Sequence, residues 1–151
     1  MTVENRLNEL GITLPDAAAP VASYVPVVVQ DGLAYVSGQL PFIDGVLAKG
    51  KLGDDVELAE GMDAARACGL MILAQLKNAG VLEDVERVVK LGAFVNSTPD
   101  FTNQPKVANG ASDLMLEVFG DAGRHARAAV SAPSLPLGAC VEVDAVIALA
   151  D

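Results

Sequence analysis

The spacing of hydrophobic residues along the chain predicts three helices. The first is short, and its apolar positions recur at i, i+4 and i+7 as Val3, Leu7 and Leu10. The longest helix is expected to open with Asp54 and Glu57, whose spacing resembles a capping box, and to close at Gly80. A third helix begins near Pro105 and carries an amphipathic stripe through residue 119.

Runs rich in β-branched residues predict strands between and after these helices. Asp31-Gly32 joins the first two runs, and this dipeptide is typical of a tight hairpin because glycine accepts a positive φ. Two further runs, near the C-terminus, flank a turn marked by Pro136 and Gly138. The first two runs cover residues 24–30 and 33–37. A further strand is predicted at 85–95, and a short strand or loop at 45–51.

The predicted order after the leading helix is β-β-(β)-α-β-α-β-β, with no internal repeat or linker. Two amphipathic helices suit a single sheet that is covered on one face. We therefore expect an α+β fold in one domain over residues 1–151, with residues 1–18 as an N-terminal extension. The runs at 25–29 and 85–95 are apolar on both sides, so the second sheet face also needs cover, and subunit packing is the natural one.

The charge of the chain narrows its expected partners. Twenty acidic residues against ten basic ones give a net charge of −10, and the pI is near 4.4. Such a surface repels phosphate groups, so neither nucleic acid nor an anionic membrane is an expected partner. The N-terminus lacks a signal-peptide pattern, and no apolar run approaches the ~18 residues of a membrane span. A cytoplasmic protein is therefore expected.

Alternation near the C-terminus singles out one glutamate and one arginine. Alternate residues of an extended chain share a face, so Glu142 and Asp144 lie opposite the apolar positions of residues 139–149. An unpaired carboxylate is expensive to bury, so Glu142 faces solvent, a partner or a site, unless it is an edge charge that prevents aggregation. Arg127 lies in the preceding run. If the two runs are neighbours, a guanidinium suited to a small carboxylate and a glutamate able to handle protons or water share one cleft.

Other candidate residues carry weaker signals. His125 is the only histidine, and a structural role is the ordinary one, since no Gly-x-Ser-x-Gly elbow supports a serine hydrolase. Cys68 and Cys140 lie in separate apolar runs, which predicts reduced core residues. Tyr24 and Ser37 bracket the first hairpin, where they either pack or offer hydroxyls to a cleft. The histidine and cysteine pattern does not form a metal site, and no Gly-rich loop supports a nucleotide cofactor, so none is expected.

Three short motifs stand at these positions. Residues 126–130 read Ala-Arg-Ala-Ala-Val, Leu-Pro follows at 135–136, and residues 141–145 read Val-Glu-Val-Asp-Ala. Residues 36–41 read Val-Ser-Gly-Gln-Leu-Pro, and residues 22–24 read Ala-Ser-Tyr. In these motifs the sequence resembles the Rid family, also called the YjgF or reactive-intermediate deaminase family, in which Ala22-Ser23-Tyr24 matches the Gly-Pro-Tyr region. The likeness extends from about residue 19 to the C-terminus.

The resemblance implies a chorismate-mutase-like fold and a homotrimer with clefts between subunits. It also implies hydrolysis of 2-enamine or 2-imine intermediates to 2-keto acids and ammonia, in the manner of a 2-iminobutanoate/2-iminopropanoate deaminase. In the family, the arginine that matches Arg127 clamps the substrate carboxylate, and the glutamate that matches Glu142 positions or activates water. The further substrate-binding residues that the resemblance implies are Tyr24, Ser37, Gly38 and Asn109.

The chain also departs from the family pattern. After the arginine the family has Ser/Thr-Cys/Ala-Val-Glu/Gly, whereas residues 128–131 here read Ala-Ala-Val-Ser. The leading helix and residues 98–110 lengthen the chain, which indicates a longer branch that kept the clamp and changed the substrate. Two other functions stay open. One is a trimeric binding module for small carboxylic metabolites, and the other is an endoribonuclease, a name some relatives carry and the charge of −10 disfavours.

Overall fold

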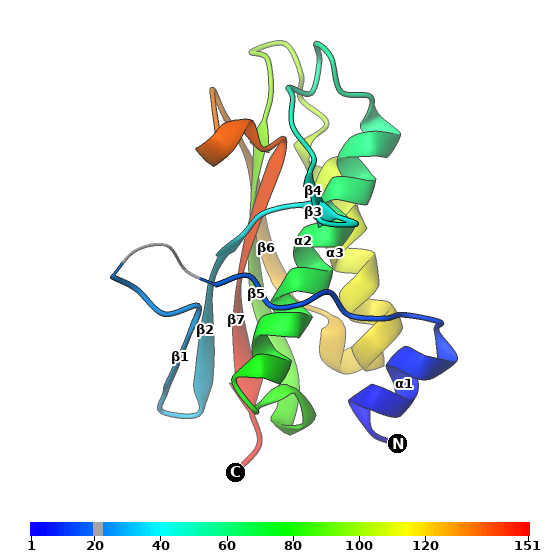
Figure 1. Cartoon of the computed structure of the whole chain (residues 1–151), viewed down its shortest axis with the longest axis vertical. Coiled ribbons are helices and arrows are strands. Elements are labelled where there is room, and N and C mark those ends of the chain that lie inside the picture. Colours follow the sequence, from blue (N-terminus) through cyan, green and yellow to red (C-terminus); the bar gives the residue numbers. More distant parts are fainter. Residues whose placement is uncertain (20–22) are drawn as a thin grey trace.

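The structure is a computed structural model that describes residues 1–19 and 23–151 (Figure 1). Ala22, the first residue of the match to the Gly-Pro-Tyr region, lies outside the described residues. The helices are α1 (Val3–Glu9), α2 (Leu58–Asn78) and α3 (Gln104–Phe119). The strands are β1 (Val27–Gln30), β2 (Leu33–Gln39), β3 (Phe42–Ile43), β4 (Val46–Leu47), β5 (Val85–Asn96), β6 (Ala126–Ala132) and β7 (Val141–Leu149).

Five strands form one mixed sheet in the order β1-β2-β7-β5-β6, and β3 and β4 form a separate small hairpin. Strands β5 and β6 are parallel, whereas the other neighbouring strands of the large sheet are antiparallel. Helices α2 and α3 pack together on one face of this sheet (Figure 1). The predicted α+β architecture, with two main helices on one face of a sheet, is therefore confirmed.

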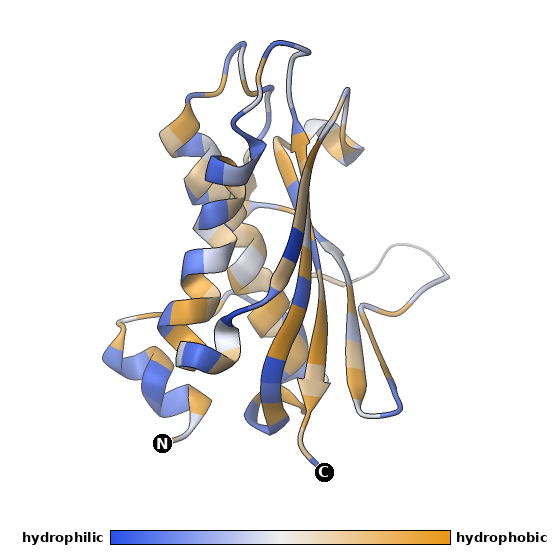
Figure 2. Cartoon of the chain, turned by 180° about the vertical axis from the view of Figure 1, so that it is seen from behind, coloured by the Kyte–Doolittle hydropathy of each residue, from blue (hydrophilic) through white to orange (hydrophobic). Residues whose placement is uncertain are grey.

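The core lies between the sheet and these two helices. Along β7, buried Val141, Val143 and Ala145 alternate with half-buried Glu142 and Asp144. The same alternation of polar and apolar residues is visible along the strands in Figure 2. Small residues let the two helices approach closely. A Cβ at Gly110 of α3 would collide with the backbone carbonyl of Met62 in α2.

The start of the longest helix differs from the sequence prediction. Helix α2 begins at Leu58, and the carboxylate of Glu60 accepts a hydrogen bond of 2.9 Å from the Glu57 amide. The capping pair is therefore Glu57 and Glu60. Asp54, predicted to open the helix, instead belongs to a turn in which its amide donates to the carbonyl of Lys51.

One strand prediction needs correction, and a second is confirmed. Strand β1 begins at Val27, three residues after the predicted start at Tyr24. The region predicted as a short strand or loop at 45–51 contains β4, which pairs with β3 through a two-residue turn. Asp44 and Gly45 form this turn, with φ of 52° and 80°. It repeats the Asp-Gly chemistry of the predicted hairpin, in which Asp31 has a φ of 53°.

The N-terminal extension is fixed to the rest of the chain. Leu7 of α1 is buried, and the amides of Val3 and Glu4 donate to the carboxylate of Glu83 at 2.8 and 3.0 Å. Arg6 Nε donates to the carbonyl of Glu117 at 2.9 Å. Two free amides at the start of α1 are thus satisfied by a side chain distant in sequence, while the N-cap Thr2 accepts from the Asn5 amide.

Both cysteines are buried and unpaired, as predicted for core residues. Burial raises the pKa of the Cys68 thiol, and it raises that of Cys140 to about 11. Neither thiol is therefore poised as a nucleophile near neutral pH. No helix among the described residues has the length and apolar character needed to cross a membrane.

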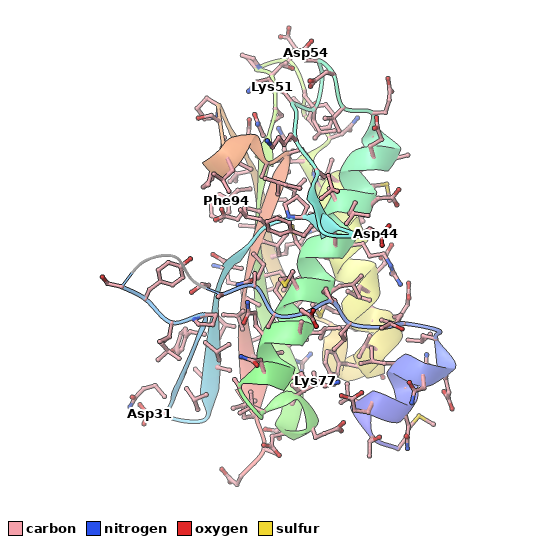
Figure 3. All side chains as sticks on the ribbon, in the orientation of Figure 1. Asp31, Asp44, Lys51, Asp54, Lys77 and Phe94 are labelled. Atoms are coloured by element: carbon pink, nitrogen blue, oxygen red, sulfur yellow. The ribbon has the colours of Figure 1, made fainter. Side chains whose placement is uncertain are left out.

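The sheet face turned away from the helices stays open in the single chain. Val28, Tyr35 and Val130 lie on this face and are 49%, 47% and 47% exposed. Phe94 belongs to the same face, because it is aligned with Glu142 on β7 (Figure 3). Cover for this face from other copies of the chain remains a prediction.

Candidate functional site

Arg127 lies on the edge strand β6 and points toward helix α3. Its register partner on β5 is Leu91, which is buried beneath the helices. Arg127 Nη1 donates to Asn109 Oδ1 at 2.8 Å and to Ser112 Oγ at 3.0 Å. Asn109 and Ser112 are three residues apart on α3 and so share a helix face. The structure therefore brings Asn109, placed from the resemblance, to the predicted clamp.

His125 supports this arrangement through Ser112. His125 Nδ1 lies 2.6 Å from the carbonyl of Gly123, which can only accept a hydrogen bond, so Nδ1 carries a proton. In the neutral ring Nε2 is then an acceptor, and Ser112 Oγ, 2.8 Å away, donates to it. Because the serine proton points to His125, a lone pair of Oγ is available for Arg127 Nη1. Ser112 was missed in the sequence, where only its spacing from Asn109 marks it.

Arg127 and its hydrogen-bond partners line a small hollow. Both protons of Nη1 are engaged, whereas no carboxylate in the described part of the chain forms an ion pair with Arg127. Nε and Nη2 are left as a two-donor fork of the kind that binds a carboxylate side-on. The hollow has a volume of about 380 Å³ and is lined by Asn109, Ser112, Asp113, Leu116, Arg124, His125 and Arg127.

Glu142 lies on β7 and faces the open side of the sheet, next to a bulge in β2. The register between β2 and β7 shifts between Val36 and Gln39, and Gly38 lies within this shift. A Cβ at Gly38 would collide with the Glu142 carboxylate, so glycine makes room for it. Burial raises the pKa of Glu142, and the charge of Asp144 raises it further. Such a shift brings a carboxyl group closer to the pH at which it works as a general base.

Asp144 repeats this arrangement one step along the same strand. A Cβ at Gly92 of β5 would collide with the Asp144 carboxylate. Burial also raises the pKa of Asp144, although a hydrogen bond from Gly92 and the charge of Lys90 act in the opposite direction. The open face thus holds two carboxylates, each placed against a glycine of a neighbouring strand.

The two predicted hydroxyls differ in their surroundings. Ser37 lies beside Gly38 in the bulge, and its Oγ donates to the carbonyl of Val25 at 3.2 Å. Tyr24 lies in the segment before β1 and is 50% exposed. Ser37, Gly38 and Glu142 therefore form one cluster on the open face, with Tyr24 on the chain that leads to it.

Comparisons with known proteins agree with the fold and the motifs. Residues 4–149 match the family model described as "YjgF/chorismate mutase-like, putative endoribonuclease". The chain belongs to the YjgF family. Protein TCP17 of Trypanosoma cruzi is 53% identical over 150 residues, which cover 97% of this chain and 94% of that protein.

Two solved structures of YjgF-like architecture are also similar to this chain. A crystal structure named as a putative endoribonuclease from Shewanella oneidensis has a TM-score of 0.94 and 37% identity, covering 99% of this chain and 100% of that one. The protein Atu1372 of unknown function from Agrobacterium tumefaciens has a TM-score of 0.89 and 48% identity, covering 97% and 92%. The likeness therefore includes nearly the whole length of each chain.

In this YjgF-family chain, Arg127 and Glu142 do not meet. Strand β5 lies between β6, which carries Arg127, and β7, which carries Glu142. The sequence alone did not decide whether these two strands are neighbours. Arg127 is aligned across the sheet with Leu91 and Ala145, both buried under the helices. Glu142 has the opposite parity on β7 and faces the open side. The expectation of one cleft shared by both side chains is thus wrong for a single copy of the chain.

Proposed function

We propose that this protein hydrolyses reactive 2-enamine or 2-imine intermediates to 2-keto acids and ammonia, at sites assembled between copies of the chain. The observation that carries the proposal is the Arg127 guanidinium, which neutral partners hold through Nη1 and which forms no ion pair with any carboxylate of residues 1–19 and 23–151. Family membership adds weight to it. A cytoplasmic location and a small substrate bearing a carboxylate are parts of the same proposal.

Arg127 supplies substrate binding in this proposal. A charge that is held by an amide oxygen and a hydroxyl keeps its affinity for an anion, whereas an arginine paired with Asp or Glu would have to break an ion pair first. The Nε and Nη2 protons form a planar fork that matches the two oxygens of a carboxylate. Holding the substrate by this end fixes the imine carbon relative to any water placed near it.

Glu142 activates the attacking water in this proposal. The water oxygen attacks the electrophilic imine carbon while its proton passes to the Glu142 carboxylate. As the C–O bond forms, the π electrons of the C=N bond move to nitrogen, which takes the proton back from Glu142. The hydroxyl proton of this adduct then passes through the same carboxylate to the nitrogen. The C–N single bond breaks with its electron pair on nitrogen, so ammonia leaves and a carbonyl remains. Because an imine is already electrophilic, a clamp and one positioned water suffice, and the reaction needs no oxidant or reductant.

The two roles require more than one copy of the chain. One protomer presents Arg127 on the helix-covered side of an edge strand and Glu142 on the opposite face of the sheet. A substrate that contacts both must therefore take them from different protomers. The half-exposed apolar residues of the open face and the unpaired edge of β6 support such an assembly. The homotrimer implied by the family resemblance is the assembly we propose.

Ammonia release from a freshly generated 2-imino acid tests the function. We expect Arg127→Ala to lower the rate over buffer by at least about 100-fold, since two charge-assisted hydrogen bonds are lost. Arg124→Ala, which removes a neighbouring charge of the same hollow, serves as the matched control and should have a much smaller effect. An unchanged rate in Arg127→Ala contradicts the proposal.

Two further measurements separate the alternatives. Tight binding of a 2-keto acid without turnover by the native protein would select the binding module. Arg127-dependent cleavage of RNA by purified protein would select the endoribonuclease, against which the net charge of −10 argues.

A further inference from the structure

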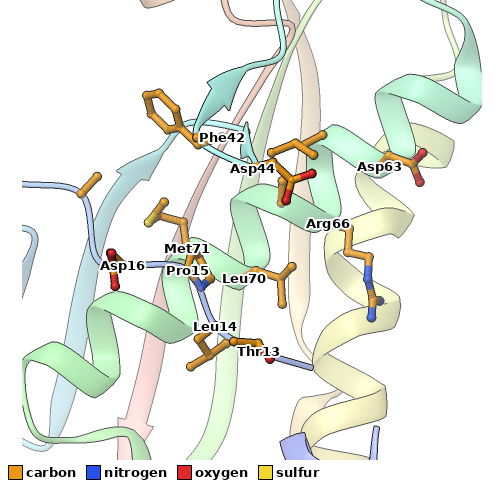
Figure 4. Close-up of a pocket in the computed structure, with 14 residues that line it drawn as sticks. Thr13, Leu14, Pro15, Asp16, Phe42, Asp44, Asp63, Arg66, Leu70 and Met71 are labelled. Carbon is orange, nitrogen blue, oxygen red and sulfur yellow. The ribbon is translucent and has the colours of Figure 1, made fainter. Parts of the chain in front are cut away.

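A second cavity lies on the outer side of helix α2 (Figure 4), and no residue of the proposed site is among its lining residues. Its volume is about 800 Å³, which falls within the usual range for small-molecule sites. Three parts of the chain enclose it: residues 13–18 of the N-terminal extension, the β3–β4 hairpin, and the outer face of α2. The proposed function uses none of these parts.

The cavity is bounded by elements that are fixed in place. Gln75 of α2 donates from Nε2 to the carbonyl of Ala18 at 2.7 Å, and α1 anchors the other end of the extension through buried Leu7. On the opposite wall, the base of the β3–β4 hairpin is attached to the start of β7 by the bond from the Cys140 amide to the Ala48 carbonyl at 3.1 Å. Both walls are therefore formed before any ligand arrives, which limits the entropy lost on binding.

The floor of the cavity is apolar. Ala67, Leu70 and Met71 follow one another at helical spacing on the outer face of α2, where a lone helix would normally present polar residues. Leu14 of the extension and Phe42 of the hairpin are half-buried and line the walls above them. Ala67 and Met71 are already buried, so a ligand with a hydrocarbon body would mainly cover the half-buried Leu70, Leu14 and Phe42.

The rim of the cavity is acidic. Asp16, Asp44 and Asp63 line it and are exposed, and none of them forms an ion pair with any described residue. In Figure 4, Asp44 projects over the middle of the floor, Asp16 lies at one end, and Asp63 and Arg66 lie at the other. Arg66 is the one basic lining residue, and it is already paired with Glu117 at 3.4 Å.

We propose that this cavity binds a small amphipathic amine, with its hydrocarbon body on the α2 floor and its ammonium group at the rim near Asp44. The charge of the rim favours a cation, because three unpaired carboxylates outweigh one arginine that is engaged elsewhere. The apolar floor favours a cation with a hydrocarbon chain over an inorganic one. The proposal is independent of the deaminase activity.

The test is titration calorimetry of the full-length protein with n-hexylamine, which is a cation at neutral pH. We expect saturable binding of one molecule per chain, and binding at least about tenfold weaker for hexanoate and for methylamine. Hexanoate has the same chain length with the opposite charge, and methylamine has the same charge without the chain. Equal binding of hexanoate, or no saturable binding of hexylamine, overturns the proposal.

The chain offers a closely matched pair of variants for locating the site. Asp44 and Asp31 each occupy the first position of an Asp-Gly hairpin turn, with φ of 52° and 53°, and they lie well apart in the molecule (Figure 3). Asparagine tolerates this conformation, so Asp44→Asn and Asp31→Asn keep the turn and remove the same charge. We expect Asp44→Asn to weaken hexylamine binding about fivefold and Asp31→Asn to leave it unchanged. Equal effects of both variants would mean nonspecific attraction and overturn the proposal.

Discussion

The two faces of the sheet carry side chains of opposite charge in different surroundings. On the helix-covered side, the positive charge of Arg127 is held by the neutral groups of Asn109 and Ser112. On the open side, Glu142 and Asp144 lie two residues apart, with their pKa values raised by burial, and each rests against a glycine of a neighbouring strand. The covered side is thus suited to binding an anion, and the open side to accepting a proton. Neither side has both properties, so the proposed chemistry depends on bringing two copies of the chain together.

The largest effect is expected from removing the proposed base. Glu142→Gln should lower kcat by about 10²–10⁴-fold, because glutamine cannot accept the proton of the attacking water.

The same variant should be more stable against unfolding than the native protein at neutral pH. A carboxyl group with a raised folded-state pKa favours folding below its ordinary pKa of about 4.3, and this contribution is lost as pH rises through the raised value. At pH 7 the variant should therefore unfold at a higher temperature, as measured by calorimetry; a fall in both activity and stability would indicate a structural role.

Moving the carboxylate without removing it should have a smaller effect. A Cβ in Gly38→Ala displaces the end of the Glu142 side chain, which is flexible, so the protein should fold while kcat falls about 10- to 100-fold. Gly92→Ala displaces Asp144 in the same way and is the matched control. Steady-state rates of the two variants test the difference between the carboxylates. A larger loss in Gly92→Ala would transfer the role of base to Asp144.

On the covered side, Ser112 is expected to act on binding alone. Ser112→Ala removes one of the two acceptors that hold Arg127 Nη1, so KM should rise about fivefold while kcat changes little. Ser134→Ala, in the exposed loop between β6 and β7, is the control. A fall in kcat with unchanged KM would show that Ser112 takes part in the reaction itself.

The smallest expected effect is a shift in pH dependence. The charge of Asp144 raises the pKa of Glu142, so Asp144→Asn should lower that pKa, although burial still holds it above the ordinary value. The acid limb of the profile of kcat/KM should consequently move to lower pH. Asp121→Asn removes the same charge at a fully exposed position, so it should leave the acid limb at the same pH. A shift to higher pH would contradict the assignment of Glu142 as the base.

Much of the fold could be predicted from the sequence, because local patterns determine its strands, helices and turns. Alternation along residues 139–149 placed Glu142 on the face opposite the core, and the Asp-Gly dipeptide located the first hairpin. The relation of Arg127 to Glu142 could not be obtained in this way. It depends on β5 lying between β6 and β7, a pairing of strands that are distant in the chain. The role of Ser112 likewise requires α3 to pack beside β6. Its spacing from Asn109 places both residues on one helix face, but it does not indicate that this face meets Arg127.

The central claim is that Arg127 and Glu142 serve one site from different protomers, and mixing two inactive variants tests it most directly. Arg127→Ala and Glu142→Gln are combined under conditions that exchange subunits, and ammonia release from a 2-imino acid is measured. Each variant supplies the side chain that the other lacks. Random exchange at equal amounts should restore roughly a quarter of the native sites, since both intact side chains meet at an interface with a probability of one half times one half. Mixed oligomers that form and stay inactive would contradict the account.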